Sequence, residues 1–113
     1  MRRDISEHKK VSEMGKKEVI KKLLKYKTLV SSHFDVDKLV LFGSYAKGTQ
    51  HADSDIDVAV IVNSINSDFF TYAPLLWKLR LEVDNRIEPV LLINGKDESG
   101  FLREILQTGL VIS

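Results

Sequence analysis

Two aspartates separated by one residue are the clearest chemical signal in this 113-residue chain. Asp55 and Asp57 flank Ile56 and open an apolar run that continues to Val62. Alternate side chains of a β-strand point to the same face, so the two carboxylates would share one side, with their Cα atoms roughly 6–7 Å apart. Like charges repel, and carboxylate oxygens are the ligands that Mg²⁺ takes together with substrate phosphates. The pair therefore predicts a Mg²⁺ site.

A glycine-serine pair precedes the aspartates and ends a short apolar run. Gly43 and Ser44 follow the apolar residues 39–42, and ten residues separate Ser44 from Asp55. A strand that ends in glycine and opens into a helical turn aims backbone N–H groups at an anion, and glycine lets the backbone approach a phosphate closely. We interpret the pair as a phosphate-binding turn in which the Ser44 hydroxyl donates. Lys47 is a candidate for neutralising phosphate charge, and the alternative is a solvated helix lysine.

The order of these residues resembles the signature of the DNA polymerase β-like nucleotidyltransferase superfamily. The glycine-serine pair, the ten residues after it and the Asp55-x-Asp57 pair carry the resemblance. The short chain is most similar to the smallest members, the minimal nucleotidyltransferases, from about residue 16 to the C-terminus. The resemblance implies a third carboxylate on a later strand. The matching residue is Glu88, where family members commonly carry aspartate.

The resemblance also implies an activity, a cofactor and a donor. It implies a nucleotidyltransferase that uses one or two Mg²⁺ ions and takes ATP as its donor. Asp55, Asp57 and Glu88 would be the catalytic residues and the metal ligands. The turn at residues 43–47 would bind the nucleotide.

A partner protein follows from the same resemblance. Minimal nucleotidyltransferases like this chain are often paired with a small helical HEPN-domain toxin, and several act as antitoxins that attach AMP to it. The implied acceptor is therefore a hydroxyl on a partner protein. Two alternatives stay open, which are a binding module that neutralises a partner by docking alone and nucleotidyl transfer to a small molecule. A nucleic-acid partner is less favoured, and self-association stays open.

Composition is that of an ordinary globular domain. Hydrophobic residues make up 43% of the chain and charged residues 29%, and there is no cysteine, which excludes disulfides and thiolate metal sites. No apolar run approaches the roughly 20 residues that cross a bilayer, and the polar residues after Met1 do not form a signal peptide. We expect one cytoplasmic domain over residues 1–113, with 1–12 either loose or the fraying start of a helix.

Charge is divided unevenly along the chain. Residues 1–27 hold ten Lys or Arg and four Asp or Glu, a surplus of +6, whereas the other 86 residues hold seven and twelve, a deficit of −5. The basic segment is either a solvated helix face or a surface for an acidic partner or a polyanion. The apolar residues 110–112 are a second candidate surface for a partner.

Hydrophobic periodicity predicts the order helix, strand, strand, helix, strand, helix. The expected elements are a helix over 16–33, strands over 38–42, 56–62 and 86–93, and an edge strand over 110–112. Between the second and third strands we expect a helix with Pro74 in its first turn and a buried stripe of Tyr72, Leu76, Leu79 and Val83. A last helix should run from a Ser99 cap to Gly109. This order predicts an α+β fold, a small mixed β-sheet flanked by helices, and it agrees with the nucleotidyltransferase fold that the resemblance implies.

Overall fold

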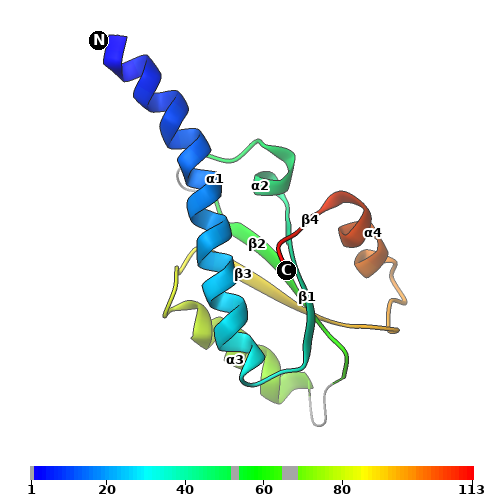
Figure 1. The fold of residues 1–113 in the computed structure, drawn as a ribbon. Coiled ribbons are helices and arrows are strands. Elements are labelled where there is room, and N and C mark those ends of the chain that lie inside the picture. Colours follow the sequence, from blue (N-terminus) through cyan, green and yellow to red (C-terminus); the bar gives the residue numbers. More distant parts are fainter. Residues whose placement is uncertain (1, 52–53, 65–68) are drawn as a thin grey trace.

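The computed structural model describes the backbone of residues 2–51, 54–64 and 69–113, and the side chains of 15–51, 54–64 and 73–113 (Figure 1). Its elements, in chain order, are α1 (Arg2–Ser31), β1 (Val36–Phe42), α2 (Ser44–Lys47), β2 (Ile56–Val62), α3 (Phe69–Arg80), β3 (Ile87–Ile93), α4 (Phe101–Thr108) and β4 (Leu110–Val111). The predicted α+β fold is confirmed, and so is the short strand near the C-terminus. The helical turn predicted after Gly43 is also present, as the one-turn helix α2 directly after β1.

The strands form one mixed sheet in the order β3-β2-β1-β4. β1 lies antiparallel to both β2 and β4. β2 and β3 are parallel, and α3 connects them, because parallel neighbours need a crossover. β3 is therefore an edge strand, and Pro89, which has no backbone N–H to donate, is tolerated on it.

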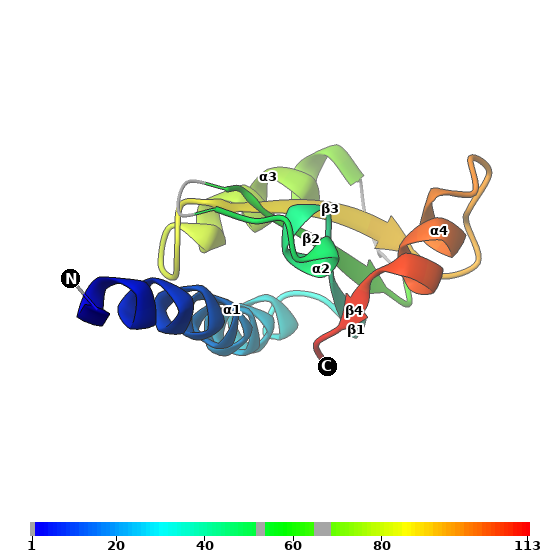
Figure 2. The ribbon, with the colours of Figure 1, turned by 90° about the horizontal axis from the view of Figure 1, so that it is seen from above.

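Alternation along β2 sends its side chains to two separate cores. On one face, Val58 packs with α1 and α3, and the Tyr26 hydroxyl on α1 donates a hydrogen bond of 2.7 Å to the Leu76 carbonyl oxygen on α3. On the other face, Ala59 packs with α4, which Figures 1 and 2 show set apart from α1 and α3. Asp57 lies two residues before Ala59 on β2, so its side chain points to the same face of the sheet, the face that α4 covers.

The first helix is longer than predicted, although its buried stripe is as expected. α1 begins at Arg2 and not near residue 16. Residues 2–14 are rich in the helix formers Glu, Lys, Arg and Met, which extend a helix even without a continuous apolar stripe. Among the side chains of α1 that the structure describes, from residue 15 onward, the buried ones are Val19, Leu23, Tyr26 and Val30.

The bounds of α3 also correct the prediction. The helix begins at Phe69, which places Pro74 in its interior and not in its first turn. Proline there removes one helical N–H bond, and burial of Leu76 and Leu79 further along offsets that loss. Val83 is half-buried beyond the end of the helix, and the side chain of Tyr72 lies outside the described ones.

Asp97, and not Ser99, is the main cap of α4. The Asp97 carboxylate accepts hydrogen bonds from the backbone N–H groups of Leu102 and Arg103 at 2.8 and 3.0 Å. Ser99 Oγ accepts only a longer one, of 3.3 Å, from the Phe101 N–H. A carboxylate suits this position because it carries negative charge at the positive end of the helix.

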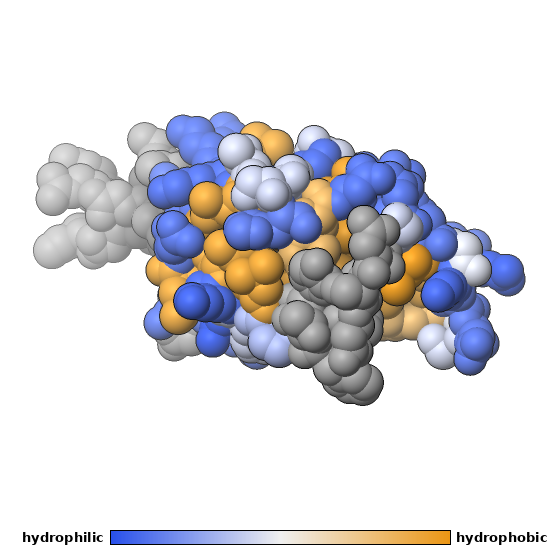
Figure 3. Space-filling model, turned by 90° about the horizontal axis from the view of Figure 1, so that it is seen from below, coloured by the Kyte–Doolittle hydropathy of each residue, from blue (hydrophilic) through white to orange (hydrophobic). Residues whose placement is uncertain are grey.

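The surface is mixed in polarity. Figure 3 shows apolar and polar patches side by side on the face seen from below, where α3 lies, and two apolar side chains of this region are exposed, Trp77 (42%) and Leu81 (64%). Of the helices that the structure describes, none is both long and apolar enough to cross a membrane.

Candidate active site

β2 has one side chain that is not fully buried, and it is a carboxylate. Asp57 is half-buried, whereas every other residue of β2 is buried. In the sheet, Asp57 pairs with Phe42 at the end of β1 and with Glu88 on β3. Residues paired across neighbouring strands point to the same face of a sheet. The sheet therefore places Asp57 and Glu88 side by side on the α4 face.

The Asp57 carboxylate lies directly over the backbone of Gly43. A Cβ atom built at Gly43 would lie 2.2 Å from Asp57 Oδ2, and the glycine has φ at 71°, in the left-handed region. Steric overlap and backbone conformation therefore both require glycine. We predicted Gly43 for its approach to a phosphate, and the structure adds its contact with the carboxylate.

The turn after Gly43 forms α2. The Lys47 N–H donates to the Gly43 carbonyl oxygen at 3.1 Å, and Gly48, in the left-handed conformation, closes the turn by donating its N–H to the Ser44 carbonyl oxygen. Ser44 is half-buried at the start of α2, and its hydroxyl bonds to none of the described residues. Lys47 is exposed at the end of α2. Ser44 thus lies one residue from the glycine that Asp57 covers, with its hydroxyl available to a ligand.

Mutual repulsion characterises the carboxylates at this end of the sheet. Burial raises the pKa of Asp57 above its ordinary value, and the charge of Asp55 raises it further. Burial also raises the pKa of Glu88, as do the charges of Asp55 and Asp57 and a hydrogen bond with Asp55, while Arg80 opposes the rise. Asp55 itself is exposed, one residue before β2. Within the described part of the chain, no three acidic, histidine or cysteine side chains are arranged to hold a metal ion by themselves. The metal role of Asp55, Asp57 and Glu88 therefore stays a prediction.

Arg80 supports the backbone that leads into Glu88. Its guanidinium stacks on the Trp77 ring, 4.6 Å from the centroid. It also donates to the carbonyl oxygen of Ile87 at 3.2 Å and to that of Asn85. Nothing in the sequence indicates this role, because an arginine in the last turn of a helix is common.

A chain of polar contacts ties α2 to α1 and to the start of β3. Arg86 Nη1 donates to the Tyr45 hydroxyl at 3.3 Å, and Arg86 Nη2 lies 2.9 Å from Asp84 Oδ2. The same oxygen accepts a hydrogen bond of 2.8 Å from Lys22 Nζ. Hydrogen bonds from Arg86 and Lys22 hold the pKa of Asp84 well below its usual range. Tyr45 follows Ser44, so this network positions the proposed phosphate-binding turn.

Comparison with known families gives the class of this site. Residues 18–113 match the family described as polymerase beta, nucleotidyltransferase. The chain belongs to this family. This match confirms the nucleotidyltransferase resemblance predicted from the sequence, and the roles of Gly43, Ser44, Asp55 and Asp57 stay predictions.

Two relatives from Methanocaldococcus jannaschii carry more specific names. "Putative protein adenylyltransferase MJ0604" is 34% identical over 79 residues, which are 68% of this chain and 78% of that protein. "Putative protein adenylyltransferase MJ1379" is 40% identical over 53 residues, which are 46% of this chain and 53% of that protein.

Two solved structures share the fold. A structure named as a putative nucleotidyltransferase from Sulfolobus solfataricus has a TM-score of 0.67 at 17% identity, covering 88% of this chain and 84% of that one. A chain of a toxin-antitoxin structure with AMP-PNP has a TM-score of 0.60 at 26% identity, covering 83% of this chain and 72% of that one.

The contact between Gly43 and Asp57 predicts an energetic coupling. Gly43→Ala should lower the free energy of unfolding by about 2–4 kcal/mol, because it adds both a steric overlap and a strained φ. In an Asp57→Ala background the overlap with the carboxylate is gone, while the backbone strain and a close approach of 3.2 Å to the remaining Cβ atom persist, so the cost should fall by about 1 kcal/mol or more. Urea unfolding of the four proteins measures the cycle. An equal cost in both backgrounds would contradict the contact.

The raised pKa of Asp57 predicts a pH-dependent stability. In the unfolded chain Asp57 loses its proton at the ordinary carboxyl pKa, whereas in the folded protein its pKa is raised. The wild type therefore loses stability as pH rises from the unfolded-state pKa through the folded-state pKa. Asp57→Asn should therefore be more stable than the wild type at pH 7, and the gain should shrink toward acid pH. Thermal unfolding across this range checks it, with Glu104→Gln on the exposed side of α4 as the control for lost charge. A variant less stable than wild type by the same amount at every pH would refute the prediction.

Proposed function

We propose that this nucleotidyltransferase transfers AMP from Mg²⁺-bound ATP to a hydroxyl group of a partner protein, as the antitoxin of a toxin-antitoxin pair. The observation that carries the proposal is the position of Asp57, which lies against Gly43 on one side and beside Glu88 on the other. Two relatives are named for adenylyl transfer to protein, and one structural neighbour is a toxin-antitoxin structure with an ATP analogue. A helical HEPN-type protein is the partner that the sequence resemblance implies.

The carboxylates fit a Mg²⁺ ion in their chemistry. Their oxygens are hard donors, and burial, together with the repulsive charge of Asp55, raises the pKa of both Asp57 and Glu88. A cation between them would relieve that repulsion. Mg²⁺ commonly takes only one or two carboxylates and completes its coordination with water and substrate phosphates, so no ready three-residue cage is needed. When bound, the ion would hold the phosphates and neutralise charge at the reacting phosphorus.

The order of the strands suggests where each substrate lies. Gly43 and Ser44 stand at the β1 side of the site, and we assign them to the terminal phosphates of ATP, with Lys47 nearby to offset their charge. Asp57 stands in the middle. Glu88 stands on the edge strand β3, the side that is open to an incoming acceptor.

The transfer itself is a displacement at the α-phosphorus of ATP. The acceptor hydroxyl oxygen forms a bond to that phosphorus, and the bond from phosphorus to the oxygen that bridges to the β-phosphate breaks. Pyrophosphate leaves with the electron pair of that bond. Glu88 takes the hydroxyl proton, and burial, which raises its pKa, makes it a better base for this purpose.

The mass of the partner protein tests this proposal. Co-expressed with wild-type chain, the partner should gain the mass of AMP, and it should gain none with Asp57→Asn, because the central ligand is lost. Intact-mass spectrometry of the purified complex measures both, and Glu104→Gln serves as the matched control. A stable complex without added mass, in which Asp57→Asn still neutralises the partner, would favour the docking module over the enzyme.

A further inference from the structure

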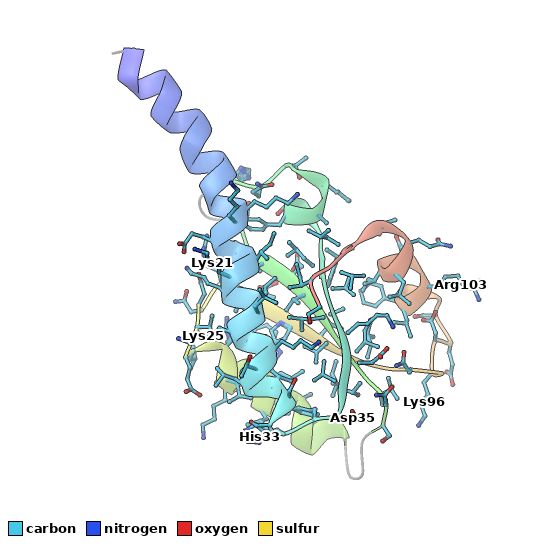
Figure 4. All side chains as sticks on the ribbon, viewed as in Figure 1. Lys21, Lys25, His33, Asp35, Lys96 and Arg103 are labelled. Atoms are coloured by element: carbon cyan, nitrogen blue, oxygen red, sulfur yellow. The ribbon has the colours of Figure 1, made fainter. Side chains whose placement is uncertain are left out.

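The outward side of α1 carries a stripe of exposed lysines. Residues 15–31 contain six lysines and one glutamate. Lys17, Lys21 and Lys25 are exposed, and their four-residue spacing aligns them along one side of the helix. Among the described residues, none forms an ion pair or a hydrogen bond with these three. Figure 4 shows Lys21 and Lys25 on the same side of α1.

Apolar side chains lie beside this stripe. Leu24 is 45% exposed, and Ile20, one helical turn before it, is half-buried. Leu110 of the C-terminal strand, 38% exposed, pairs with Leu41 and so lies on the sheet face that α1 covers. Lys27 Nζ donates to Ser113 Oγ at 2.9 Å and holds the C-terminus beside α1. We call Lys17, Ile20, Lys21, Leu24 and Lys25 the α1 docking face.

α1 is linked to the phosphate-binding turn by polar contacts that it makes through Lys22, on another side of the helix than the α1 docking face. Lys22, which follows Lys21, bonds to Asp84. Asp84 pairs with Arg86, and Arg86 bonds to Tyr45, the residue after Ser44. A protein seated on α1 would therefore bind a helix that is linked through this network to the turn that we assign to the phosphates.

We propose that the α1 docking face binds a helix of the acceptor protein, one whose apolar stripe is bordered by aspartate or glutamate. This rests on the proposed transfer to a protein. The apolar stripe would cover Leu24 and Ile20, and its acidic borders would meet the lysines. A nucleic acid fits less well, because single-strand sites combine basic residues with exposed aromatic ones, and the aromatic residue of this segment, Tyr26, is buried.

A pair of stapled helical peptides tests the α1 docking face directly. Both carry the same leucine stripe, bordered by glutamate in one and by lysine in the other, and fluorescence anisotropy of the full chain measures their binding. The glutamate peptide should bind, and the lysine peptide should not. Lys21→Glu with Lys25→Glu should weaken the glutamate peptide by at least about tenfold. The matched control is Lys96→Glu with Arg103→Glu, two exposed charges far from α1 in Figure 4, which should leave its affinity within about twofold.

Two further arms separate this proposal from its alternatives. Leu24→Ser should also weaken the glutamate peptide, because part of the contact is apolar. Equal losses in both charge-reversal pairs, or an RNA oligonucleotide that binds more tightly than the peptide and ignores Leu24→Ser, would overturn the proposal. ATP binding, measured by calorimetry, should be the same in all these variants. If even the wild type binds no ATP while peptide binding behaves as expected, the proposed catalysis fails and the docking face stands.

Discussion

The contact between the Asp57 carboxylate and the Gly43 backbone is the constraint on which the site depends. Because no Cβ fits between them, the residue that follows β1 beside Asp57 must be glycine, and the left-handed φ of that glycine turns the chain into α2. The same register pairs Asp57 with Glu88 on the other side. One close approach thus sets the positions of the turn, the central carboxylate and the edge carboxylate together.

Function and stability oppose each other at this point. Three acidic side chains share one end of the sheet, and burial, followed by the charge of neighbouring aspartates, raises the pKa of Asp57 and Glu88. The cost is offset elsewhere, since β2 is buried on both faces and two helices pack on one of them. Arg80 and the Asp84–Arg86 pair hold the surrounding backbone without neutralising the group. Carboxylates that repel one another in an otherwise well-packed sheet are expected at a site where a cation-bound substrate must enter.

The local sequence pattern was enough to predict the strands and to single out the aspartate pair. It was insufficient to predict which strands are neighbours and which residues contact one another between elements. The apolar run at 56–62 has the bounds of β2, because a strand buried on both faces reads as a continuous hydrophobic segment. Glu88 was found through family resemblance alone, since nothing in its spacing from Asp57 indicates that β2 and β3 are parallel neighbours. Arg80 and Asp84 were missed for the same reason: their partners are brought to them by the turn into β3 and by α1. The prediction that Pro74 lies in the first turn of α3 was wrong, because packing of the helix outweighs the one helical hydrogen bond that proline removes.

The most direct test of the account is whether the aspartate pair links ATP binding to Mg²⁺. A ligand that binds only the folded protein adds about 2.7 kcal/mol at a hundredfold its dissociation constant. Thermal unfolding with Mg²⁺ and ATP together should therefore raise the melting temperature of the wild type clearly above its value with ATP and EDTA. The Asp55→Asn, Asp57→Asn variant should melt at or above the ligand-free wild type and shift little with either addition. An equal Mg²⁺-dependent shift in both proteins would contradict the assignment of the carboxylates.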